Sequence, residues 1–60
     1  MKLINSDKEN RWIIVDLVSD YDAEILTACG FKYAYVVDEN GHNGEDGKDY
    51  PYEIWHNINK

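Results

Sequence analysis

The feature that most constrains the fold is a single helix-type segment placed between two pairs of strand-type segments. Ser19 is suited to cap a helix, Asp20 and Asp22 follow in its first turn, and Gly30 is suited to end it. We therefore expect a helix over about 20–29. Its apolar stripe is expected to comprise Ile25, Leu26 and Cys29, with Ala23 alongside.

The flanking segments have strand character. Leu3-Ile4 predicts a short strand, and 11–18 predicts a longer one that is apolar on both faces and should lie centrally in a sheet. On the other side, 31–37 and 50–58 alternate with period two, and Pro51 restricts the latter to a sheet edge or to the start of a strand. Residues 19–30 are long enough to cross over between parallel strands, although an antiparallel arrangement remains open.

This order predicts one small α+β domain over 1–60, with about four strands in one sheet (ββαββ) and one helix packed on one face. Alternation places the aromatic positions of 31–37 on one face and the small ones on the other. The small residues Ala34 and Val36 would let the helix approach closely. The opposite face would then lack a cover, so it should either bind a partner or be covered by another chain. Its expected members are Phe31, Tyr33, Tyr35 and Val37, joined by Tyr50 and Tyr52.

Several classes of function fit the chain poorly. A 60-residue domain seldom spares enough residues to wall a pocket of roughly 300 Å³, so we expect no enzyme. Cys29 is the only cysteine and cannot form an internal disulfide. Its spacing to His42 and His56 matches no short zinc-ligand pair, and nothing places either histidine as its catalytic base. We therefore expect no catalytic residue, metal or cofactor.

The sequence also shows no targeting signal. No apolar run approaches the roughly 18 residues of a membrane helix, and the first residues contain no apolar stretch typical of a secretory signal. We expect a cytoplasmic protein without a membrane partner.

Charge is the strongest functional signal. The formal net charge is −6, and no Lys or Arg lies between Trp12 and Phe31. Binding to nucleic acid depends on neutralising phosphates with basic side chains, so direct binding is disfavoured and a basic protein partner is favoured. The acidic residues fall into two clusters: Asp16, Asp20, Asp22 and Glu24 in the first, and Asp38, Glu39, Glu45, Asp46 and Asp49 in the second.

These clusters predict a small protein-binding module, an inhibitor that occupies the basic, nucleic-acid-binding surface of a partner. Alternate acidic residues on a helix are spaced about 3 Å apart along its axis, close to the charge spacing of about 3.4 Å in one DNA strand. Phage-type nucleic-acid mimics act in this way. The plain alternative is a solvated face that keeps a small domain soluble. The predicted partner-binding residues are Asp16, Asp20, Asp22, Glu24, Tyr33, Tyr35, Asp38, Glu39, Glu45, Asp46, Tyr52 and Trp55.

Trp12 is expected in the core. Trp55 is expected to be half exposed, because it alternates with Ile54 and Ile58 in an edge-like strand.

Two further functions remain open. The first is a homo-oligomeric structural or regulatory subunit, such as a homodimer joined through its tyrosines. The second is weak calcium binding by 38–49, where Asp38, Asn40 and His42 match ligand positions of an EF-hand loop, as do Asp46 and Asp49. The loop lacks the turn glycine and the bidentate glutamate, and strands flank it. Asn40-Gly41 is its best candidate for a tight turn.

Overall fold

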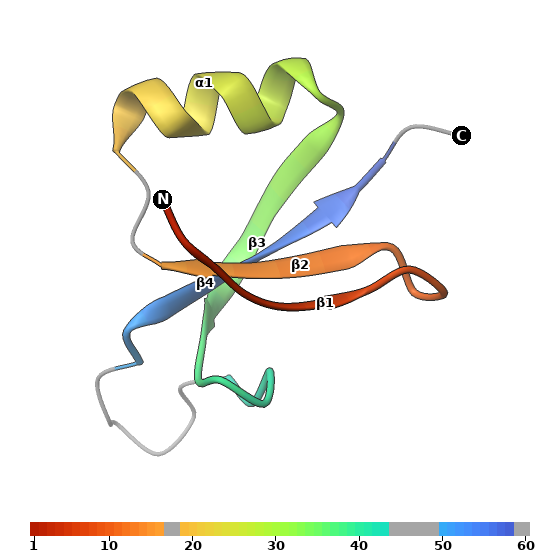
Figure 1. Cartoon of the computed structure of the whole chain (residues 1–60), viewed down its shortest axis with the longest axis vertical. Coiled ribbons are helices and arrows are strands. Elements are labelled where there is room, and N and C mark those ends of the chain that lie inside the picture. Colours follow the sequence, from red (N-terminus) through yellow and green to blue (C-terminus); the bar gives the residue numbers. More distant parts are fainter. Residues whose placement is uncertain (17–18, 44–49, 59–60) are drawn as a thin grey trace.

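The computed structural model describes residues 1–16, 19–43 and 50–58. Within these ranges the chain forms four strands and one helix (Figure 1). They are β1 (Leu3–Asp7), β2 (Trp12–Asp16), α1 (Asp20–Ala28), β3 (Phe31–Val37) and β4 (Tyr52–Asn57). The predicted α+β class and element order are confirmed. The helix found in these ranges is too short to cross a membrane.

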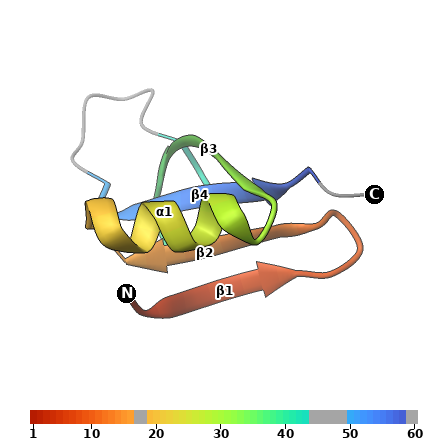
Figure 2. The ribbon, with the colours of Figure 1, turned by 90° about the horizontal axis from the view of Figure 1, so that it is seen from above.

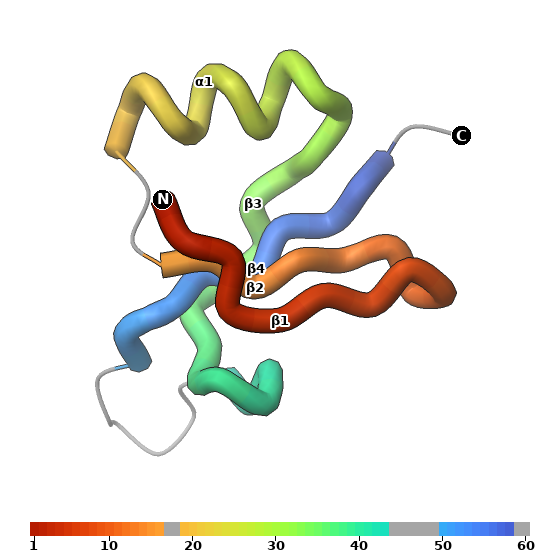
Figure 3. The backbone as a smooth tube through the Cα atoms, viewed as in Figure 1, coloured from red at the N-terminus to blue at the C-terminus, as the bar shows by residue number. Residues whose placement is uncertain are grey.

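The strands make one antiparallel sheet in the order β1-β2-β4-β3. Because β4 pairs antiparallel with both β2 and β3, those two strands run parallel, and α1 is the crossover between them (Figure 3). The central position predicted for β2 is confirmed. The edge position considered for 50–58 is wrong, since β4 lies inside the sheet. Pro51 directly precedes Tyr52, the first residue of the strand, so the ladder loses no N–H donor there.

The ends of α1 follow the sequence signals. The Ser19 hydroxyl accepts a hydrogen bond from the Asp22 N–H at 3.3 Å. At the other end, Gly30 has a φ of 93°, which glycine adopts without strain, and donates its N–H to the Thr27 carbonyl at 3.0 Å. The predicted cap and terminator are both confirmed.

The helix packs on one face of the sheet (Figure 2). Its buried side chain is Leu26, which forms a core cluster with Val15 and Trp55, and Ala23 and Phe31 pack against that cluster. The predicted helix stripe is therefore wrong in part. Ile25 and Cys29 are exposed, because only the side of α1 that carries Ala23 and Leu26 faces the sheet.

The opposite face has its own core and its own cover. Ile14, Val37 and Ile54 are buried there. The segment 38–43 lies on the side of the sheet opposite α1 (Figure 1) and packs its backbone against this core. A methyl group added to Gly41 would lie 3.6 Å from the Ile14 Cδ1 atom. The expectation of an uncovered face is thus wrong, because the loop supplies a second layer. Partly buried residues complete that layer: Ile4, Trp12, Ala34 and Tyr52.

A β-bulge in β3 changes which face its aromatic side chains occupy. Tyr33 lies opposite Trp55 of β4, whereas Tyr35 lies opposite Ile54, the adjacent residue. The two-residue step from Tyr33 to Tyr35 in β3 thus pairs with a one-residue step in β4. As a result, the alternation of β3 side chains between the two faces of the sheet reverses at Ala34. The predicted single face containing both tyrosines is wrong. Phe31 packs in the helix-side core, and Ala34 packs against the far-side core instead of facing the helix.

Candidate partner-binding surface

The acidic residues of the first cluster do not form one row. Asp20 and Glu24 are exposed on α1, and Asp16 is exposed at the end of β2. Asp22 is half-buried on another side of the helix, where its carboxylate pairs with the Met1 amino group at 3.4 Å. The three evenly spaced helix carboxylates predicted to imitate a phosphate strand are therefore reduced to two.

These two carboxylates are one helical turn apart and share the solvent side of α1. Asp20 and Glu24 stand in an i, i+4 relationship, which brings like charges close together and costs about 0.2–0.5 kcal/mol. Neither has a cation within 4.0 Å among the residues that the structure describes. The last turn of α1 has no basic residue. Neither carboxylate is therefore paired with a described cation, and Asp20, in the first turn, interacts favourably with the helix dipole.

Large apolar side chains lie beside these charges. Tyr21 is 71% exposed and Ile25 is 41% exposed, and they too are one helical turn apart. We call Asp20, Tyr21, Glu24 and Ile25 the outer helix surface. An aromatic and an aliphatic anchor at i, i+4, flanked by charge, is the arrangement by which an amphipathic helix binds a groove in another protein.

Sequence reasoning found the charges of this surface but missed its apolar part. The available signal was the pair Tyr21 and Ile25, which the i, i+4 spacing places on a single stripe next to the acids. Ile25 was instead assigned to the core, because it is adjacent to Leu26 and because a helix stripe is usually read as the buried one.

The described part of the second acidic cluster organises its own loop. The Asp38 Oδ1 atom accepts hydrogen bonds from the N–H groups of Asn40 and His42, both at 2.9 Å. The bond from the His42 N–H is the main cause that lowers the pKa of Asp38. The His42 Nδ1 atom also lies 3.4 Å from the Asp38 Oδ2 atom. Asp38 is thus a turn-forming residue, whereas the neighbouring Glu39 is exposed.

A tight turn is present one position earlier than predicted, with Glu39 and Asn40, instead of Asn40-Gly41, as its central residues. Gly41 donates its N–H to the Asp38 carbonyl at 3.1 Å, and Val37 forms an isolated bridge with Asn43. The turn therefore folds back on the free edge of β3 instead of leading directly to β4. Glu45, Asp46 and Asp49 lie outside the described residues.

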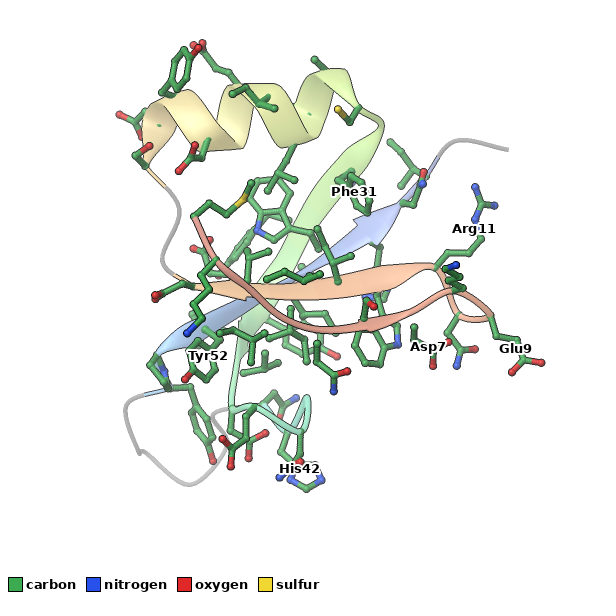
Figure 4. The ribbon with its side chains drawn as sticks, in the orientation of Figure 1. Asp7, Glu9, Arg11, Phe31, His42 and Tyr52 are labelled. Atoms are coloured by element: carbon green, nitrogen blue, oxygen red, sulfur yellow. The ribbon has the colours of Figure 1, made fainter. Side chains whose placement is uncertain are left out.

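The aromatic members of the predicted site are dispersed. Trp55 is only 5% exposed and belongs to the helix-side core, so its predicted role as a partner contact is wrong. Trp55 is buried because β4 is an interior strand, not the edge strand that the sequence predicted. Trp12, expected in the core, is half-buried and packs against the far-side core. Tyr33 and Tyr35 are each about half exposed, on opposite faces, and Tyr52 is half-buried below the sheet (Figure 4).

Side chains with metal-binding or nucleophilic chemistry do not converge. Cys29 ends α1, His42 lies in the 38–43 segment, and His56 lies near the end of β4. Within the described ranges, no three side chains of the His, Cys, Asp and Glu types are grouped to hold a metal ion.

Comparison of the chain with protein-family models, with curated proteins and with solved structures finds no match.

Proposed function

We propose that this chain is a small, non-enzymatic protein-binding module that inhibits a basic partner in the cytoplasm by occupying its cationic surface. The observation that carries the proposal is the outer helix surface, where two acids that pair with no described cation lie beside exposed Tyr21 and Ile25. The acids attract the partner through the net charge of −6, and the apolar pair forms the desolvated contact.

The composition of this surface supports binding over a purely solubilising role. A solubilising face needs charge only, whereas Tyr21 and Ile25 expose apolar area that favours association. The i, i+4 repulsion between Asp20 and Glu24 also opposes helix stability, and no described cation offsets it at Glu24. Asp16, exposed at the end of β2, adds to the negative charge of the chain, as does Glu39 on the side of the sheet opposite α1.

The test is capture from lysate with paired single-charge variants. Glu24→Gln removes one charge from the outer helix surface, and Glu9→Gln removes one from the exposed β1–β2 turn. The wild type and Glu9→Gln should retain the same basic protein, and Glu24→Gln should bind it about threefold more weakly. Tyr21→Ala should weaken binding further. Equal retention by both charge variants, or binding indifferent to salt, would reject the proposal.

The nucleic-acid-mimic form of the proposal has a separate readout. If the captured protein handles DNA or RNA, the wild type should displace nucleic acid from it in competition, and Glu24→Gln should do so less effectively. If the chain inhibits the captured protein without displacing nucleic acid from it, the basic partner is supported and nucleic-acid mimicry is rejected. Asp22 pairs with the Met1 amino group, so only two helix carboxylates are left to imitate a phosphate strand. Mimicry therefore needs more support than binding to a basic partner does.

A homodimer is the second candidate, favoured by the exposed side chains of Tyr33, Tyr35 and Val36 on the edge strand β3. The bulge at Ala34 and the bridge from Asn43 both interrupt this edge, and such features hinder strand pairing between molecules. Light scattering at micromolar concentration distinguishes the candidates. A tight dimer in which Tyr33 and Tyr35 are shielded from solvent would favour the homodimer.

A further inference from the structure

A groove of about 400 Å³ opens at the β1–β2 turn end of the sheet, away from the outer helix surface. Its apolar lining comes from Leu3, Trp12, Ile13 and Phe31. The groove exists because α1 packs its buried side chain, Leu26, against Val15 and Trp55 and leaves β1 and the β1–β2 turn less covered (Figure 2). Leu3 is accordingly 60% exposed, and Ile13 and Phe31 are only half-buried.

The groove also carries positive charge, in a chain that is otherwise acidic. Lys8 and Arg11 line it, and neither has a carboxylate within 4.0 Å among the described residues. Asp7 is the one acid in the lining, and its carboxylate is engaged in the turn. Its oxygens accept the Asn10 N–H at 3.0 Å and the Asn10 Nδ2 at 2.9 Å. In Figure 4, Asp7 and Arg11 point to opposite sides of the hairpin.

The backbone at Arg11 is held in a conformation that L-residues seldom adopt. Its φ is 62°, in the left-handed region, and its carbonyl accepts the Asn57 N–H at 2.8 Å. This conformation is unfavourable for arginine by roughly 1–2 kcal/mol. The Arg11 side chain lies on the same side of the sheet as Phe31 and α1 (Figure 4). An apolar floor and a forked cationic donor therefore share one concave site.

We propose that this groove binds a small apolar carboxylate, of which a medium-chain fatty acid is the type. The hydrocarbon lies on Leu3, Ile13 and Phe31. The carboxylate receives paired hydrogen bonds from the Arg11 guanidinium, with Lys8 adding charge. A monoanion fits better than a phosphate dianion, because the net charge of −6 opposes more negative ligands.

The test is a titration of the full chain with decanoate, kept below its micelle concentration and followed by amide and methyl NMR shifts. Saturable shifts should concentrate at Leu3, Ile13, Phe31 and Arg11. Decanol, which has the same tail without charge, should bind about tenfold more weakly. Arg11→Gln should weaken decanoate binding about threefold to tenfold.

Matched variants separate this site from general effects. Lys32→Gln removes an exposed cation outside the groove and should leave decanoate binding unchanged, as should Glu24→Gln on the outer helix surface. Leu3→Ser changes an exposed side chain and should weaken binding without unfolding the domain. No saturable shift with decanoate would overturn the proposal. Equal binding of decanol, or equal effects of Arg11→Gln and Lys32→Gln, would do the same.

Discussion

The rings of Tyr33 and Trp55 meet edge to face, with centroids 5.7 Å apart and ring planes inclined by 68°. The two residues are direct partners across β3 and β4, and Trp55 belongs to the core cluster beneath α1. Tyr33 therefore forms the outer rim of that core.

Shortening Trp55 should be the most damaging change in the helix-side core. Trp55→Ala is expected to cost about 3–5 kcal/mol, which is comparable to the whole stability of a domain this small. Tyr33→Leu should cost about 1 kcal/mol through loss of the ring pair. Urea denaturation followed by circular dichroism measures both. Tyr35→Leu is the control, and a cost equal to that of Tyr33→Leu would contradict the described ring contact.

Replacing Arg11 by glycine should stabilise the domain. Glycine adopts a φ of 62° without steric cost, which removes roughly 1–2 kcal/mol of strain, and its greater freedom in the unfolded chain returns part of this gain. The expected net effect is about +0.5 to +1 kcal/mol in the free energy of unfolding. Arg11→Val should destabilise instead, since a β-branched residue tolerates this region worst. In thermal denaturation, the melting temperature should rise for Arg11→Gly and fall for Arg11→Val.

Acid should destabilise the fold through two turn-forming carboxylates. The Asn10 N–H, followed by its side-chain amide, holds the pKa of Asp7 below its usual 3.8, and the His42 N–H does the same for Asp38. Because each pKa is lower in the folded state, each carboxylate contributes stability above pH 3.8 that is lost as pH falls through the folded value.

The melting temperature should therefore decline as pH falls toward and below 3.8. Asp7→Asn and Asp38→Asn should each lower stability at neutral pH. In each variant the melting temperature should also depend less steeply on pH in this acid range. Glu39→Gln, at an exposed position next to Asp38, should leave it unchanged. If both Asp variants lose melting temperature with falling pH as the unmodified chain does, these hydrogen bonds do not control the acid destabilisation.

The helix cap offers an independent check of the fold. Ser19→Ala removes the acceptor for the Asp22 N–H and should cost about 1 kcal/mol, whereas Ser19→Asp should preserve the cap. Chemical denaturation distinguishes them. If alanine and aspartate are equally tolerated, the cap does not contribute to stability.

Stability and partner binding should respond in opposite directions at Glu24. Glu24→Gln relieves the repulsion with Asp20 and should raise the free energy of unfolding by about 0.2–0.5 kcal/mol while weakening partner capture. Asp20→Asn should not share the gain, because Asp20 also interacts favourably with the amino-terminal end of the helix dipole. Denaturation and capture with the same preparations measure both effects. A Glu24→Gln chain that loses both stability and binding would contradict this account.

The element order was predictable because capping residues, apolar periodicity and glycine placement are local signals. Ser19, Gly30 and the alternation of β4 each required only a few neighbouring residues. The faces of β3 were not predictable, because the bulge between Tyr33 and Tyr35 depends on the register with β4, which lies far along the chain. Burial of Ile14 similarly depends on Gly41 folding back from another loop.

The candidate site was predictable in charge but not in shape. Asp20 and Glu24 were identified from the clustering of acidic residues along the sequence, whereas the exposure of Tyr21 and Ile25 depends on which side of α1 meets the sheet. That choice follows from Trp55 and Leu26 packing together, a tertiary contact between residues distant in sequence.

The position of β4 also has a kinetic consequence. Of the described strands it is the last to be synthesised, yet both β2 and β3 need it as a neighbour. A nascent chain that has not yet extended past residue 57 could form the β1–β2 hairpin but not the complete sheet. Completion of the sheet must therefore wait for the late, non-local insertion of β4. Until then, a chaperone or protease would encounter β3 without its strand partner.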